Sequence, residues 1–177
     1  MPSGAPVSIE GGECKVAGGG FAALPDVTDL QGHAIDPAGV PAQDSPGYYT
    51  GEPVIIAVAD ANRNADPGVR EFVLVEITTT TGDAETVRLQ ETGVDTGYFA
   101  AAIQSVPMPP DAVQFDCRLS LGDKAGLTAR YADTDYPLDA LAATAVAYPP
   151  LAADEAILRL EQSVSRQFVE VGDFVEY

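Results

Sequence analysis

Tryptophan is absent, and the 177-residue chain carries only one histidine, two lysines and two cysteines. Acidic residues number 27 against 9 Lys and Arg, which gives a formal net charge of −18 at pH 7. This excess of negative charge disfavours binding to nucleic acids and anionic lipid surfaces, because both would repel it. No apolar run approaches the ~20 residues that span a bilayer. We therefore expect neither nucleic-acid partners nor membrane insertion.

Residues that carry catalysis are equally scarce. His33 lies in a stretch rich in Gly, Asp and Pro, with no serine or cysteine in a nucleophile context nearby. Gly18-Gly19-Gly20 is not followed by Lys-Ser/Thr, so it does not match a phosphate-binding loop. We expect a protein that is not an enzyme.

The two cysteines, Cys14 and Cys117, lie far apart and form no C-x-x-C pair. His33 does not stand at metal-ligand spacing from either of them. An even cysteine count in an exported protein favours a disulfide, and two unrelated buried thiols are the alternative. We predict that Cys14 and Cys117 are joined.

Short β-rich segments separated by Gly, Pro and Asp turns recur about every ten residues from Pro53 onward, which predicts an antiparallel β-sandwich. The seven expected strands are Pro53–Asp60, Glu71–Thr79, Glu85–Gln90, Tyr98–Ile103, Ala112–Leu121, Gly126–Ala132 and Leu141–Tyr148. Leu138–Ala147 is rich in alanine, yet Pro137 and Pro149-Pro150 bracket it, so a strand is favoured over a helix.

Composition divides the chain into three parts. Residues 1–45 are rich in Gly, Pro and Ala and are predicted to form an irregular arm with strand fragments at Val7–Ile9 and Cys14–Val16. Residues 46–149 hold the seven-strand sandwich. Residues 150–177 start a new strand pattern, read as a linker and the first strands of a following domain, because two strands alone are not stable. Residues 1–6 do not resemble a signal peptide, so an export signal would lie elsewhere.

Several phrases follow one another in an order that identifies a family. Tyr49–Pro53 leads into the Asp/Asn-rich Val58–Pro67, Gly82–Phe99 contains LQETGVDTGYF, and LSLGDK and ARYADTD follow. The series resembles the immunoglobulin-like (Ig-like) modules of very large bacterial cell-surface and extracellular proteins. Ser163–Tyr177 is similar to the opening of a conserved-repeat Ig-like domain. The resemblance covers about residues 45–177 and implies an Ig-like sandwich with a spacer or adhesive role.

One loop has the oxygen spacing of a calcium site. Carboxylate and amide side chains stand at its first, third, fifth and seventh places, with a carboxylate at the twelfth: Asp60, Asn62, Asn64, Asp66 and Glu71. Calcium takes six to eight oxygen ligands, which such a loop can converge. The sixth place holds Ala65 instead of glycine and the flanks are strands, so a turn in which Asp and Asn bond their own backbone is the alternative.

A second acidic group, Asp133, Asp135 and Asp139, would complete such a site if the loops share one end of the sandwich. A solvated turn is the alternative reading of this group.

Together these features predict a structural or adhesive, calcium-stabilised Ig-like segment of a large secreted bacterial surface protein or extracellular filament. Its expected partners are neighbouring modules of the same polypeptide or identical chains. One rival is a subunit that self-assembles by strand addition through Phe168–Tyr177. The other is a module that binds a surface glycan or protein, which a patch of exposed tyrosines would favour. The candidate tyrosines are Tyr48, Tyr49, Tyr98, Tyr131 and Tyr136.

Overall fold

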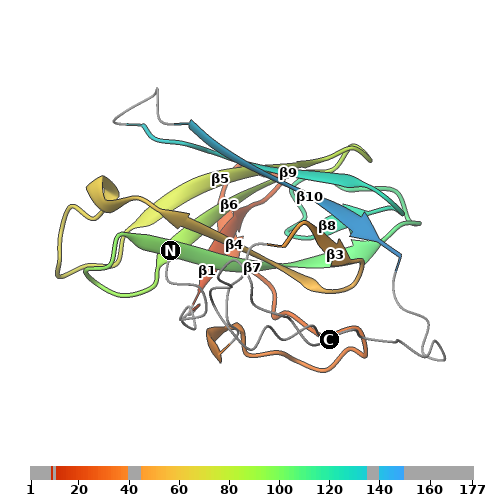
Figure 1. Cartoon of the computed structure of the whole chain (residues 1–177), viewed down its shortest axis with the longest axis horizontal. Coiled ribbons are helices and arrows are strands. Elements are labelled where there is room, and N and C mark those ends of the chain that lie inside the picture. The colour runs from red at the N-terminus through yellow and green to blue at the C-terminus, as the bar shows by residue number, and fades with distance from the viewer. Residues whose placement is uncertain (1–8, 10, 40–44, 135–139, 150–177) are drawn as a thin grey trace, which may run out of the picture.

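The computed structural model describes residues 9, 11–39, 45–134 and 140–149 (Figure 1). The expected opening strands of a second domain at 150–177 therefore lie outside the described residues, as does the fragment Val7–Ser8. Within the described part the protein is almost entirely β-structure. Its strands are β1 Gly12–Lys15, β2 Phe21–Ala23, β3 Gly47–Tyr49, β4 Pro53–Ala59, β5 Phe72–Thr79, β6 Ala84–Glu91, β7 Tyr98–Pro107, β8 Leu119–Leu121, β9 Gly126–Ala132 and β10 Ala140–Tyr148.

The strands form two layers. The first has the order β2-β1-β6-β5-β9-β10-β3, and the second consists of β4, β7 and β8. The first residues of β7 also pair with the end of β6, through Gln90↔Ala100 and Glu91↔Phe99. Backbone hydrogen bonds therefore join the two layers at this corner. All neighbours are antiparallel except β3 with β10 and β8 with β7. The observed all-β sandwich confirms the fold class predicted from the spacing of the turns.

Alternation along each strand creates the core between the layers. In β5 and β6 every second residue is buried, and β4 buries Val54, Ile56 and Val58 against them. Phe99 and Ile103 of β7 are fully buried in the same cluster. Side chains in a strand point alternately to opposite faces, so burial of every second residue means that one face of each strand packs in the core.

The expected strand Ala112–Leu121 is wrong over most of its length. Only Leu119–Leu121 is a strand, and the residues before it form a loop in which Phe115 and Cys117 have φ values of 59° and 68°. The amides of Asp116 and Cys117 bond the Glu85 carboxylate instead of a neighbouring strand. These amides are therefore bonded to a side chain and not to the backbone of a neighbouring strand, which a β-strand would require.

The N-terminal part is more regular than expected. β1 pairs with β6, placing Cys14 opposite Val87, and β2 pairs with β1 at the edge of the larger sheet. Farther along, β3 was not expected as a strand and pairs in parallel with the end of β10. The two remaining elements are the 3-10 turns η1 Pro37–Gly39 and η2 Ala61–Arg63. No helix in the described residues has the length and apolar character needed to cross a membrane.

Candidate functional site

Three loops meet at the end of the sandwich where β4 stops. The Asp60 carboxylate caps η2 by accepting the Asn62 amide (3.2 Å) and also accepts the Tyr131 hydroxyl of β9 (2.6 Å). The Asn62 side chain donates to the buried Asp133 carboxylate (3.0 Å). The loop that follows β4 is thus bonded to the end of β9. Asp133 lies beside the Asp/Asn loop, while Asp135 and Asp139 lie outside the described residues.

Burial raises the pKa of Tyr131 well above its usual value, and its hydrogen bond to Asp60 and the nearby Asp133 carboxylate act in the same direction. The hydroxyl is only a donor in this pairing, so Tyr131 stays neutral and keeps Asp60 in place. Tyr131 is 6% exposed. It therefore belongs to the core and not to a binding patch.

The rest of the predicted calcium loop bonds its own backbone and a neighbouring loop. Glu71 accepts the amides of Ala65 and Asp66, and Asp66 accepts the amide of Gly68. Asn64 donates to Asp95 of the β6–β7 turn (2.8 Å). These are the bonds of the Asx-rich turn that stood as the alternative to a metal site.

Glu91 organises the β6–β7 turn from inside. It is 1% exposed, and its carboxylate accepts the amides of Thr96 and Gly97, both at 2.7 Å, and the amide of Glu71 at 3.4 Å. Burial opposes its ionisation, but these backbone donors outweigh burial and hold the pKa of Glu91 below its usual value. Gly97 has φ 59°, and a Cβ there would lie 2.9 Å from the Ala61 Cα, so glycine permits the close approach of the two loops.

The structure brings the five predicted ligands into one network without gathering their carboxylates around a point. Within the described residues, no group of three or more His, Cys, Asp or Glu is placed to hold a metal ion. Two oxygens of the network, Asn64 Oδ1 and Glu71 Oε2, are nevertheless buried and accept no hydrogen bond from a described residue. Buried acceptors without a donor are costly, so these two oxygens are the ones that a cation could use.

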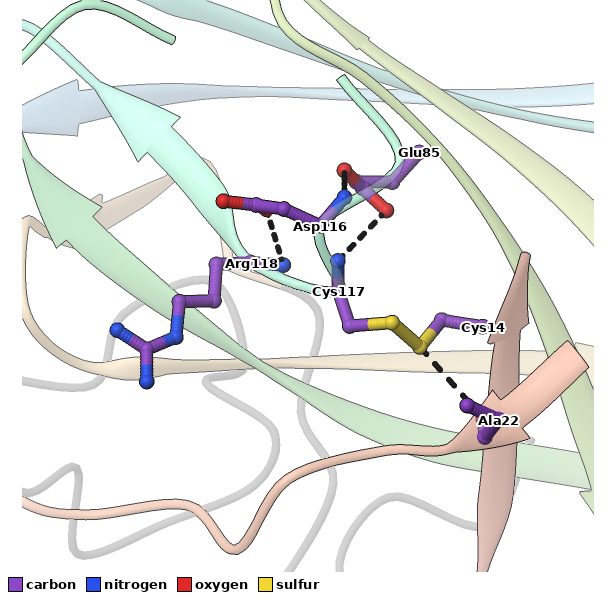
Figure 2. Close-up of a disulfide and its surroundings, with 6 residues drawn as sticks. All are labelled: Cys14, Ala22, Glu85, Asp116, Cys117 and Arg118. Atoms are coloured by element: carbon purple, nitrogen blue, oxygen red, sulfur yellow. Dashed lines mark hydrogen bonds between the residues drawn. A yellow bond between two sulfur atoms is a disulfide. The ribbon is translucent and has the colours of Figure 1, made fainter. Parts of the chain in front are cut away.

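A second group of carboxylates surrounds the disulfide. Cys14 of β1 is bonded to Cys117, with Cα atoms 5.5 Å apart, as predicted from the sequence (Figure 2). Glu85 of β6 accepts the amides of Asp116 (3.0 Å) and Cys117 (3.2 Å), and Asp83 accepts the amide of Ser120 (2.6 Å). The loop before β8 is therefore held by one covalent bond and two buried carboxylates.

Asp83 and Glu85 were not singled out from the sequence, although a signal exists. Asp83 and Glu85 stand four and two residues before Val87, in phase with Val87 and Leu89, which places both carboxylates on the side of the sheet that faces the core. Burial raises the pKa of both groups, to about 7 for Glu85, and the neighbouring Asp116 carboxylate adds to the effect. Acidic residues in phase with a buried face indicate a structural acceptor for backbone N–H groups.

Among the candidate tyrosines that the structure describes, none is fully exposed, and Tyr131 is buried. Tyr136 lies outside the described residues, and Tyr49 contacts the ring of Tyr148 at 6.1 Å between centroids. A groove of about 390 Å³ opens where β3 turns into β4, lined mainly by Leu30, Ile35, Tyr48, Pro53 and Ile55. Its polar lining residues are Asp29, Gln31, Ser45 and Glu52.

No protein-family model matches this chain, and no curated protein sequence matches it.

We predict that removing the disulfide weakens the fold strongly. It closes a separation of 103 residues, so a Cys14→Ser/Cys117→Ser variant should lose about 4–5 kcal/mol of unfolding free energy in the chain-entropy model. Urea denaturation of the variant, with the reduced wild type as control, measures the loss. Equal urea midpoints for the oxidised and reduced wild type would show that the bond contributes nothing.

A second prediction concerns pH. The folded protein retains the Glu85 proton up to about pH 7, whereas the unfolded chain releases it near 4.5. The stabilising contribution is therefore complete below pH 4.5 and is lost as pH rises through 7, by at most about 3 kcal/mol. Urea denaturation of wild type and Glu85→Gln from about pH 4 to about pH 8 isolates this contribution. A constant difference between the two proteins across that range would contradict the prediction.

Proposed function

We propose that this chain is a non-enzymatic structural or adhesive segment, an Ig-like β-sandwich within a larger secreted bacterial surface protein or extracellular fibre. The observation that carries the proposal is the use of polar side chains at the loop end. Asp60 and Asn62 bond the loop after β4 to Tyr131 of β9 and to Asp133, and Glu91 bonds the end of that loop to β6, so these groups hold separate segments of the fold together. Loops bonded to each other in this way suit a module that must stay folded at a cell surface.

The chemistry of the chain supports the same function. A disulfide is typical of oxidising compartments outside the cytosol. A net charge of −18 keeps a repeated module soluble and limits its association with other acidic surfaces. The ordered resemblance of residues 45–177 to Ig-like surface modules adds a spacer role between neighbouring domains.

The module boundary provides a direct test. If residues 151–177 belong to a following domain, a chain ending at Pro150 should keep its free energy of unfolding within about 0.5 kcal/mol of the full chain. Urea denaturation followed by circular dichroism compares the two. A loss of several kcal/mol would show that the removed segment is an integral strand and that the boundary is wrong.

Calcium stabilisation is a narrower part of the proposal. The support is the pair of buried oxygens without donors, Asn64 Oδ1 and Glu71 Oε2, in the loop with calcium-like spacing. A cation bound there would join the Asp60–Glu71 loop to the β6–β7 turn, because Asn64 already contacts Asp95. It would act as a cross-link and supply no chemistry.

Calcium should therefore raise the melting temperature of chelator-treated protein. Binding to the folded state alone adds about 2.7 kcal/mol at a hundredfold excess over Kd. Asn64→Ala removes one of the two oxygens and should abolish the shift, as should Asp60→Ala, which frees the loop from Tyr131. Asp26→Asn removes an exposed carboxylate elsewhere and should leave the shift intact. A melting curve unchanged by millimolar calcium would reject the calcium site and leave the structural function standing.

A further inference from the structure

Strand β4 is one of two long stretches of described strand that pair on one side only; the other is Ala140–Ala145 of β10, because β3 pairs only with the last three residues of that strand. Four described strands lie at sheet edges, and three of them, β2, β3 and β8, have three residues each. Short edge strands are one way in which proteins prevent pairing with other chains. β4 has seven residues and, among the described strands, pairs only with β7 (Figure 1).

The free edge of β4 presents a regular row of backbone groups. Glu52 and Asp60, which flank the strand, bond residues 105 and 97 of the β7 side, so even-numbered residues face β7. Hydrogen bonding alternates along an antiparallel strand. The amides and carbonyls of Ile55, Ala57 and Ala59 therefore point away from β7, and no hydrogen bond joins them to a described residue outside the β4–β7 ladder.

Nothing in the sequence of β4 protects this edge. The strand reads PVIIAVA, with no charge, no glycine and proline only at its first position. The start of β10 is also incompletely covered on its inward face. Leu141 is 56% exposed although Ala145 and Ala147, in the same phase, are buried. Leu141 pairs with Tyr131, whose hydroxyl bonds Asp60 directly after β4, so the uncovered side chain lies at the same end of the sandwich.

We propose that the β4 edge binds the β4 edge of a second copy of this chain, antiparallel and around a two-fold axis at Ala57. In this register each Ala57 amide bonds the Ala57 carbonyl of the other copy. Ile55 of each copy lies opposite Ala59 of the other, and each of these pairs forms two backbone hydrogen bonds. Every outward amide of the strand then has an acceptor, and Pro53, which lacks an amide, lies outside the paired region.

Side chains agree with this register. Ala57 faces Ala57 and Ile55 faces Ala59 on the outer surface, so the small residues Ala57 and Ala59 allow close approach. On the inner face Ile56 lies opposite Val58, which extends the apolar layer of the second sheet toward the uncovered side of β10. This self-complementarity identifies a second copy as the occupant, since a symmetric pair makes each contact twice.

Charge sets the conditions for pairing. Each copy carries a formal charge of −18, so two copies repel each other at low ionic strength although β4 itself is neutral. Dimerisation should therefore strengthen with added salt, which is the reverse of an association held by opposite charges. The inference goes beyond the proposed spacer function and does not depend on it.

Sedimentation equilibrium of the full chain at low and high salt tests the proposal. We expect a reversible shift from 18.4 kDa toward twice that mass as salt rises. Ala57→Pro removes the central donor at a position whose amide does not bond β7, and it should abolish the dimer. Ala57→Lys and Ala57→Glu each place like charges opposite one another and should weaken the dimer about fivefold. An equimolar mixture of these two variants should restore pairing, because Lys then faces Glu.

The controls separate this edge from other causes of association. Ala132→Lys changes an exposed residue of β9 and should leave the dimer intact, and circular dichroism confirms that each variant is folded. A chain ending at Pro150 should also dimerise. If that truncation abolishes the dimer, a strand from residues 151–177 occupies the edge and the proposal fails. A monomer at every salt concentration, or a dimer indifferent to Ala57→Pro, would equally overturn it.

Discussion

Buried carboxylates that accept backbone N–H groups hold the loops of this sandwich. Glu91 receives amides from its own turn and from the Asp60–Glu71 loop, while Glu85 and Asp83 receive the amides that precede and begin β8. Each acid lies at the end of a strand whose neighbours are apolar, and among the described residues no basic side chain pairs with any of the three. A carboxylate offers two oxygens in fixed geometry, so one side chain can position a loop that has no ladder of its own.

The same interaction accounts for the different pKa values of these buried acids. Backbone donors lower the pKa of Glu91 in spite of its burial, whereas burial raises the pKa of Glu85 to about 7. Burial acts against ionisation of both acids, but Glu85 has fewer bonds from backbone amides and lies beside the Asp83 and Asp116 carboxylates, which raise its pKa further. On the same face of the sheet, the disulfide fixes the N-terminal strands to the loop that Glu85 holds, because Cys14 lies opposite Val87. The buried carboxylates of the described part thus bond the protein's own segments, which supports the structural role proposed above.

The edge strands differ in how they are protected from pairing with another chain. Three of the described edge strands have only three residues each, whereas β4 presents a long, neutral row of backbone groups with no described partner. The start of β10 does the same, because β3 pairs only with the last three residues of that strand. The lysines and interior prolines that commonly block such an edge are missing from β4. The negative net charge of the protein opposes pairing at this edge, because two copies repel each other whatever the sequence of the strand.

Turn residues and alternating apolar residues are enough to predict several strands. Gly126–Ala132 is predicted with its observed bounds and Pro53–Asp60 to within one residue. The sequence also indicated the disulfide and the group of oxygens after β4. The contacts of the side chains after β4 depend on the tertiary structure. Their partners Tyr131, Asp95 and Asp133 are about 30 to 70 residues away along the sequence. The tertiary structure also reduced Ala112–Leu121 to three residues of strand, since Glu85 and Asp83 take the amides there. Local patterns record which face is buried, whereas hydrogen bonds between distant loops depend on how the two sheets pack.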